Sequence, residues 1–489
     1  MKLINFIKGD KFFLLLVSFC FLVVFYFKLS KYYFHYDDAF IIYNYVRNLI
    51  NGYGFVYHPN FTPVQGSSSF LYTILLALIC KIFPFFEIYK IGLMFSVLCY
   101  IGILFILYFL FKERFKEIKI KERYTIFIIS FSFQIPLLFS LGMDWLFVNI
   151  FLLLIIYLIY RKSTFVNIFI LTALLPLVRF EFLFFLPPIL ISYFLVNKNI
   201  PNTLKLIIGP IVLSFFYLIF SKIYFGNFLP QTWLAKLLIP SEVSGVINWI
   251  SFINYNKALL FIIIIFIVSF ILILKQILLK LLSNKLFYIF FIFFFFSVIY
   301  TLILGFKGAP NMPWYYVTTF LFIQYIILYF CHLIFLKKKF FAYILLTVIL
   351  ISNTIVAVNF SESLVIKTKE FIINKRGHED RREKIGIYLS KISDIENKKI
   401  LVYEIGKIAY FSKAKIYDIL GLVSPEAMIG LEKNDTLLTL LAVDPDYVIG
   451  VDSLMYFPMK FLDSKYFKEN YVKTYQVDDY IVWKRVKNN

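Results

Sequence analysis

Two adjacent aspartates, Asp37 and Asp38, are the residues of this sequence whose types and spacing best suit chemistry. Acids are scarce in the first 359 residues, where only ten Asp and Glu occur. Neighbouring carboxylates repel each other, so at least one of a pair usually has a shifted pKa or a cationic partner. The pair is suited to act as a general base, or to hold a divalent metal such as Mg²⁺ or Mn²⁺ against a phosphate.

A short helix is expected directly after the pair. The sequence from about Ala39 to Ile50 has a helical pattern, the two acids precede it as N-terminal caps, and Asn51-Gly52 ends it. Arg47 lies nine residues after Asp38, on nearly the opposite side of a straight helix. A phosphate is therefore the expected partner of Arg47, rather than Asp38.

Further polar residues come from later segments. Asp144 and Glu181 are acids that fall at the ends of apolar runs, and Arg179 precedes Glu181 by two positions. Gln231 and Lys236 lie in an aromatic, amide-containing loop that suits sugar and phosphate binding. Each of these residues, taken alone, equally fits a helix cap or the polar belt of a membrane interface. Together they predict one outward-facing cavity built from separate segments.

The elements that must hold these residues are predominantly helices in a membrane. The 489-residue chain is 61% hydrophobic and 21% aromatic, with mean hydropathy +0.81, which indicates lipid as the main solvent. Apolar runs long enough to cross a bilayer predict eleven spans. They fall near 12 to 28, 88 to 111, 125 to 142, 145 to 160, 164 to 178, 182 to 196, 204 to 222, 258 to 280, 286 to 304, 314 to 336 and 340 to 358.

Basic loops predict the orientation of these spans. The run from Ser69 to Phe83 is short, and counting it as a span places the basic segment 111 to 124 outside, against the positive-inside rule. We therefore expect an amphipathic or re-entrant surface helix there. The N-terminus, with an uncleaved first span, is then cytoplasmic, the first outer loop is 29 to 87, and the tail is extracytoplasmic.

Charge and cysteine content exclude other classes of protein. The formal net charge is +21, but residues 1 to 359 carry 29 Lys and Arg against 10 acids, whereas the tail carries 21 against 19. The basic excess therefore belongs to the membrane part, where anionic lipid headgroups neutralise it, and nucleic-acid binding is not indicated. The four cysteines all lie in apolar stretches, so no disulfide framework or cysteine metal site is expected.

The tail, residues 360 to 489, is expected to form a small α/β domain. Strand-like runs occur in "KKILVYEI", "AKIYDIL", "DYVIGVD", "YVKTYQV" and "DYIVWKRV", with helical patterns around 378 to 393 and 434 to 442. About 130 residues are enough to bury a core. The domain organisation is therefore a membrane domain, 1 to 359, followed by this α/β domain.

Several segments together resemble a known superfamily. The run "YDDAFIIYNYVRNLINGYGFVYHPNFTPVQGSSSFLYTILLAL" is similar to the first outer loop of GT-C glycosyltransferases, especially the arabinofuranosyltransferase branch. "SLGMDWLFVNIFLLLIIY" resembles a G-M-E-T segment, with Asp144 in place of Glu. "LVRFEFLFF" resembles R-P-E-G, keeping Arg179 and Glu181 but losing Pro and Gly. "YFGNFLPQTWLAKL" and "EIGKIAYFSKAKIYDILGLVSPEA" resemble a later loop and the first tail strands.

The resemblance implies an enzyme of the outer face of the inner or plasma membrane. It would move a sugar from a polyprenyl-phosphate donor to a glycan, lipid or protein acceptor by inverting displacement. Asp37 or Asp38 would take the acceptor proton, and Arg47, Arg179 or Lys236 would stabilise the phosphate charge. A divalent metal bridging the pair is a further possibility, and the departure from R-P-E-G leaves the sugar open.

Two other functions stay open. A transporter or flippase of lipid-linked glycans predicts charged residues at mid-span and interrupted, repeated helices. A polymer ligase of the same broad fold differs from the first hypothesis only in using a lipid-diphosphate donor. A sensor with a binding module in the tail leaves the outer acids unexplained.

Overall fold

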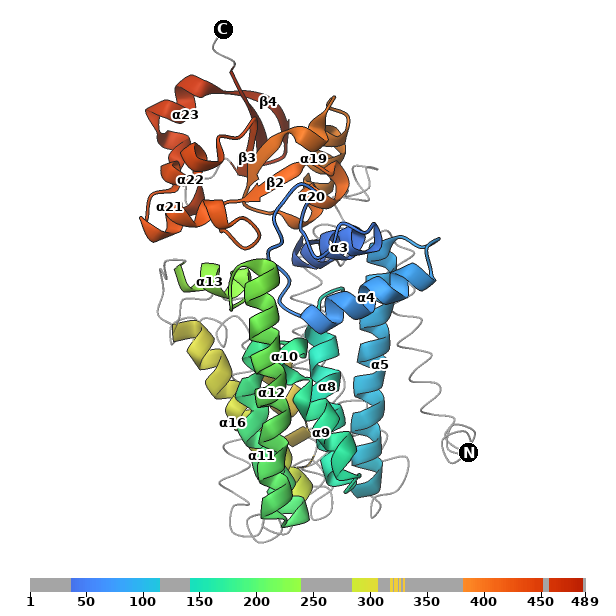
Figure 1. Ribbon diagram of the computed structural model, residues 1–489. Helices are drawn as coiled ribbons and strands as arrows, with labels where there is room; N and C mark the ends of the chain where they lie inside the picture. The colour runs from blue at the N-terminus through green and yellow to red at the C-terminus, as the bar shows by residue number, and fades with distance from the viewer. Residues whose placement is uncertain are drawn as a thin grey trace, which may run out of the picture.

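The structure is a computed structural model, and it describes residues 37–114, 141–238, 284–306, parts of 317–329, 381–451 and 457–486. It consists of a helical part and a small sheet domain at one end of it (Figure 1). The helices of the helical part are α3 (Asp37–Ile50), α4 (Phe70–Ile82), α5 (Ile88–Arg114), α8 (Trp145–Tyr160), α9 (Phe165–Ala173), α10 (Leu175–Val178), η2 (Phe180–Phe185), α11 (Leu186–Asn197), α12 (Ile200–Phe225), α13 (Gln231–Leu238) and α16 (Lys285–Phe306).

Four helical stretches within the described residues are long and apolar enough to cross a membrane. They are Ile88–Leu110, Phe180–Asn197, Ile200–Phe225 and Lys285–Ile303. Six of the expected apolar runs lie within the described residues, and all six are helical. They are 88 to 111, 145 to 160, 164 to 178, 182 to 196, 204 to 222 and 286 to 304. The other five, at 12 to 28, 125 to 142, 258 to 280, 314 to 336 and 340 to 358, lie wholly or mostly outside the described residues.

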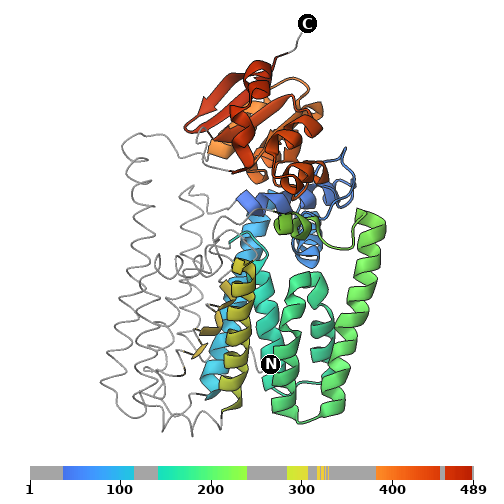
Figure 2. The ribbon, with the colours of Figure 1, turned by 90° about the vertical axis from the view of Figure 1, so that its left-hand side faces the viewer.

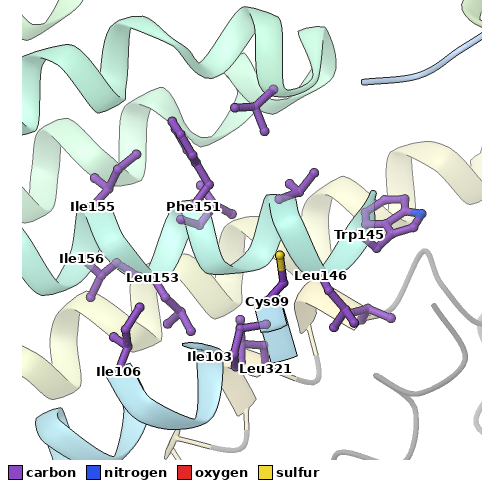
Figure 3. Close-up of a cluster of buried hydrophobic side chains, with 14 of the residues drawn as sticks. Cys99, Ile103, Ile106, Trp145, Leu146, Phe151, Leu153, Ile155, Ile156 and Leu321 are labelled. Carbon is purple, nitrogen blue, oxygen red and sulfur yellow. The ribbon is translucent and has the colours of Figure 1, made fainter. Parts of the chain in front are cut away.

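The long helices pack side by side around a continuous apolar core. Figure 3 shows part of it, where Cys99 and Ile103 of α5 gather with Leu146 and Leu153 of α8. Figure 2 shows α11 and α12 running along the same bundle, joined by a short turn. Large apolar side chains also lie exposed on the outside of the bundle, for example Ile208, Ile211 and Phe215 of α12, as expected for a surface in contact with lipid.

The chain between α9 and α11 is irregular. Prolines at Pro176 and Pro187 remove backbone donors, and α9 and α10 are followed by the 3-10 helix η2. Arg179 lies at the break in an extended conformation, with φ −161° and ψ 129°. The runs expected at 164 to 178 and 182 to 196 are therefore helical but interrupted, and Arg179 is the residue at the interruption.

The helix expected at 69 to 83 is α4. The Ser69 side chain accepts a hydrogen bond from Tyr72 N at 3.2 Å, which caps its first turn. Its 13 residues give a length of roughly 20 Å, too short to cross a hydrocarbon core of about 30 Å. In Figure 1 it lies with α3 between the bundle and the sheet domain.

The tail domain contains one mixed five-stranded sheet in the order β2-β1-β3-β5-β4. Strands β1, β2 and β3 are parallel, and β5 pairs antiparallel with β3 and β4. The five strand-like runs of the sequence all form strands, which confirms the expected α/β tail. The elements are α19 (Arg381–Ser390), η4 (Ile395–Asn397), β1 (Lys399–Val402), α20 (Gly406–Ser412), β2 (Lys415–Asp418), η5 (Pro425–Ala427), α21 (Met428–Glu432), α22 (Thr436–Val443), β3 (Tyr447–Val451), η6 (Phe457–Asp463), α23 (Lys465–Asn470), β4 (Tyr471–Val477) and β5 (Tyr480–Arg485).

Helix α3 belongs to the cores of both parts. Phe40 and Tyr43 pack in the core of the bundle, whereas Ile41 and Tyr45 pack with Ile400 and Ile408 in the core of the tail. Ten of the 14 residues of α3 are buried, and Asp38 is the exposed one. One of the two buried clusters of the tail is therefore shared with the segment 37 to 87, and the other consists of tail residues alone.

Candidate active site

Asp37 is the first residue of α3 and points into the tail domain. Its Oδ2 accepts a hydrogen bond from Gly406 N at 2.7 Å, and its Oδ1 accepts one from Lys407 N at 2.8 Å. These two N–H groups are at the start of α20, where a helix has donors without internal partners. Asp37 is thus a cap for a helix that lies 369 positions later in the chain.

Three more polar contacts join α3 and the loop after it to the same segment. Asn44 Nδ2 donates to Gly406 O at 3.3 Å, and Tyr57 Oη donates to Ile405 O at 3.0 Å. Arg47 Nη1 donates to Tyr410 O at 2.8 Å, and its guanidinium lies 5.1 Å from the centre of the Tyr410 ring. Arg47, expected to contact phosphate, is held here against the tail.

Asp38 has a different environment from Asp37. It is exposed, although the protein surrounding its carboxyl group desolvates it enough to raise the pKa to about 6. The Asp37 carboxylate adds to this rise in pKa by repulsion. An exposed carboxyl group with a pKa near 6 is ionised at neutral pH and can still accept a proton efficiently.

Besides Asp37, the charged groups that interact with Asp38 come from four separate segments. Two cations, Lys236 of α13 and Arg382 of α19, lower its pKa, and the carboxylate of Asp144 raises it slightly. Asp418, at the end of β2, is itself affected by the charge of Asp38. The charges of Asp144 and Lys236, which the sequence grouped with Asp38, therefore act on Asp38 together with the charges of two tail residues.

Asp144 and Glu181 are joined by Arg179. Arg179 Nη1 donates to both oxygens of Asp144 at 3.2 and 3.1 Å, and Nε and Nη2 donate to Glu181 Oε1 at 2.8 and 2.6 Å. The guanidinium also lies 4.3 Å from the centre of the Trp145 ring. Arg179 and Asp144 are buried, so this ion cluster fixes the ends of α8 and η2 to each other.

Gln231 reaches the tail on the other side of the site. Its Nε2 donates to Gly421 O at 2.9 Å, and its backbone N donates to Gln65 O at 3.0 Å. Gly421 belongs to the loop after β2, which Asp418 fixes by accepting hydrogen bonds from Leu420 N and Leu422 N. Gln231 therefore connects α13, the first outer loop and the tail.

The donor set of the pair does not fit a bridging metal. Both oxygens of Asp37 already accept backbone N–H groups, which leaves Asp38 as a single carboxylate ligand. Across the part of the chain that the structure describes, no group of three or more His, Cys, Asp or Glu side chains is arranged to hold a metal ion. His58, near the pair in sequence, accepts a hydrogen bond from Asn60 N through Nδ1.

The tail contributes residues to this site that the sequence did not predict. Asp418 is the last residue of β2, and Glu404, which accepts a hydrogen bond from Arg382 Nη1 at 3.1 Å, lies two residues after the end of β1. The carboxyl ends of parallel strands are a common place for functional side chains. That signal was present in "AKIYDIL" and "LVYEIG". Arg382 had no comparable signal, because it lies in a run of mixed charges.

In the comparison with known protein families, the match lies in the tail. Residues 373–486 match a family described as "Domain of unknown function (DUF8728)". A search of curated proteins found no match to the chain. The matched residues include α20, which Asp37 caps, and Arg382 and Asp418, which act on Asp38.

Proposed function

We propose that this protein is a multi-pass membrane glycosyltransferase that moves a sugar from a polyprenyl-phosphate donor to a glycan, lipid or protein acceptor outside the membrane. The observation that carries the proposal is Asp38, an accessible carboxyl group with a pKa raised to about 6, acted on by Lys236 and Arg382. A base with a pKa near neutrality and nearby cations are what an acceptor hydroxyl and a leaving phosphate require.

The proposed step is a single displacement. The acceptor hydroxyl oxygen forms a bond to the anomeric carbon while the bond from that carbon to the phosphate oxygen breaks. Asp38 takes the hydroxyl proton, and the lipid phosphate leaves as an anion that Lys236 and Arg382 stabilise. In this proposal the Asp144–Arg179–Glu181 cluster joins the starts of α8 and η2 and does not bind the phosphate.

The finer architecture is part of the same proposal. A GT-C-like fold with about eleven spans, a cytoplasmic N-terminus and an extracytoplasmic tail puts α3, α4 and the tail on the outer side. The apolar helices support a place in a bilayer. The sequence similarity of residues 36 to 78 to a GT-C first outer loop supports the substrate class.

The test uses purified full-length protein in lipid nanodiscs with polyprenyl-phosphate sugars and a cell-envelope extract as acceptor source. Release of polyprenyl phosphate, measured by mass spectrometry, is the expected result. Asp38→Asn is expected to lower the rate by about 10²–10⁴-fold, the usual contribution of a general base. The control is Asp435→Asn, an exposed cap of α22 within the tail, which is expected to turn over normally.

Two results contradict the proposal. One is full turnover by Asp38→Asn. The other is transfer of lipid-linked sugar across sealed vesicles without any release of polyprenyl phosphate, which identifies a flippase. Consumption of polyprenyl-diphosphate glycans alone replaces the donor class by that of a polymer ligase.

A further inference from the structure

We infer that Asp37 is a positioning residue that docks the tail domain onto α3, and that the tail domain is thereby a built-in part of the active site. The inference rests on the proposed function, since it divides the work of the acid pair. Asp38 reacts, whereas Asp37 holds in place the helix that presents Asp38.

The hydrogen bonds of Asp37 are those of a cap. Each carboxylate oxygen accepts one backbone N–H of α20, and the side chain is only 8% exposed. Charge-assisted hydrogen bonds of this kind are about twice as strong as neutral ones. A carboxylate used in this way is poorly placed to accept a proton from a substrate.

Gly406 shows how closely the two segments approach. A Cβ atom at this position would lie 1.8 Å from the backbone oxygen of Asp37 and 3.0 Å from its Cγ. Only glycine permits this approach, because a backbone oxygen at the start of a helix cannot move aside. The sequence of the tail is thus fitted to the backbone of α3 as well as to the Asp37 side chain.

Aromatic packing extends the junction along α3. The Phe40 ring lies 5.1 Å from Tyr410 and 5.8 Å from Phe411, measured between ring centres. Lys407 Nζ lies 5.5 Å from the centre of the Phe40 ring. One turn further on, Arg47 and Asn44 bond to Tyr410 O and Gly406 O. The junction therefore spans three turns of α3 and fixes the direction of the helix.

The position of the two acids in the helix explains their different roles. Adjacent helical residues point about 100° apart, so a helix whose first residue faces the tail directs the second elsewhere. Asp37 is buried against α20, and Asp38 is exposed. Docking of the tail at Asp37 thus sets where Asp38 points, and it also brings Arg382 and Asp418 toward Asp38.

The first arm of the experiment measures docking without any substrate. Hydrogen–deuterium exchange of the full-length protein in nanodiscs is followed over 405 to 412. Asp37→Asn replaces one acceptor oxygen by a donor that faces a backbone N–H, and Gly406→Ala forces the two segments apart. Both variants are expected to exchange these amides about tenfold faster or more, because a lost charge-assisted hydrogen bond destabilises the closed state. Asp435→Asn, the matched cap within the tail, is expected to exchange as wild type.

The second arm measures transfer as a function of pH. Both docking variants keep Asp38 and are expected to transfer sugar more slowly than wild type but faster than Asp38→Asn. For Asp37→Asn, the pH at which transfer falls on the acid side is expected to lie below that of wild type, because the Asp37 charge that raises the Asp38 pKa is removed. Gly406→Ala keeps this charge. The charged groups that face Asp38 are Asp37, Lys236, Arg382, Asp144 and Asp418.

The two arms separate this inference from the proposed function. Unchanged exchange at 405 to 412 in both docking variants overturns the inference, as does Asp37→Asn with a complete loss of transfer and normal exchange, which makes Asp37 itself the base. Faster exchange with residual, pH-shifted transfer supports it. If Asp38→Asn retains full turnover, the proposed function fails while the docking result can still be judged from exchange.

Discussion

At the scale of single residues, identical side chains at adjacent positions have different surroundings. Asp37 accepts two backbone N–H groups from the tail, and Asp38 remains exposed beside cations from α13 and α19. The sequence showed a pair, and the structure distinguishes its members. The pKa of Asp38, raised to about 6, leads to a direct expectation about pH.

Transfer is expected to fall as the pH is lowered through about 6. Because the pKa of Asp38 is raised, the carboxyl group becomes protonated at a higher pH than an ordinary aspartate, and only its ionised form acts as a base. Lys236→Gln removes a cation that lowers this pKa, so its acid limb is expected at higher pH than in wild type. Initial rates between pH 5 and 8 check both; a rate that stays constant down to pH 5 in the wild type contradicts the assignment.

Arg179 is expected to matter for stability more than for phosphate binding. Arg179→Ala leaves the buried carboxylate of Asp144 without its cation, which costs about 3–5 kcal/mol. Glu181 is 31% exposed, so Glu181→Gln is expected to cost only about 1 kcal/mol. Thermal unfolding in detergent compares the two variants. If Arg179→Ala and wild type unfold at the same temperature, the Asp144–Arg179–Glu181 cluster does not stabilise the fold.

At the scale of elements, α3 is held in position by contacts with both the helical bundle and the tail. The sequence predicted a helix from about Ala39 to Ile50, and the structure begins it two residues earlier, at Asp37, so the acids lie in the first turn. From below, Tyr43 donates to Gly142 O at 3.1 Å, which ties α3 to the turn before Asp144. On the side of the tail, α20 packs against α3.

The approach of α5 to α3 gives a test at this scale. A Cβ on Gly92 of α5 would lie 2.5 Å from Cε1 of the Tyr43 ring, which is fully buried and hydrogen-bonded. Gly92→Ala is therefore expected to displace α3 and lower transfer by roughly tenfold to a hundredfold. Gly102→Ala, on the same helix, meets only the movable Cδ1 of Ile150 and serves as the control. Equal rates for the two variants would argue against a fixed position for α3.

At the scale of the whole molecule, the two parts are not independent units. The sequence indicated a tail with a core of its own, and one buried cluster, which includes Leu401, Val448 and Phe461, consists of tail residues alone. A second buried cluster joins tail residues to Ile41, Tyr45 and Phe55 of the loop 37 to 87. The two parts of the chain are therefore joined by one shared cluster, beside the cluster that the tail forms by itself. A tail anchored to this loop must lie on the same side of the membrane as the loop.

Labelling from outside checks that side. In a variant with its four native cysteines replaced by serine, Ser390→Cys in the tail is expected to react with an impermeant maleimide in right-side-out vesicles. Lys162→Cys, between α8 and α9, is expected to react only after permeabilisation. Both positions are exposed in the structure. The reverse pattern inverts the proposed topology.

Within the part of the chain that the structure describes, the sequence by itself determined the apolar helices and the five tail strands, because hydropathy and periodicity act over neighbouring residues. The tertiary structure decided what the side chains do. Asp37 meets Gly406 across 369 positions, and Arg179 meets Asp144 across 35. Such partners leave no trace in local spacing, since either carboxylate of the pair could have faced the tail. The choice depends on how α20 packs against α3, which only the folded chain specifies.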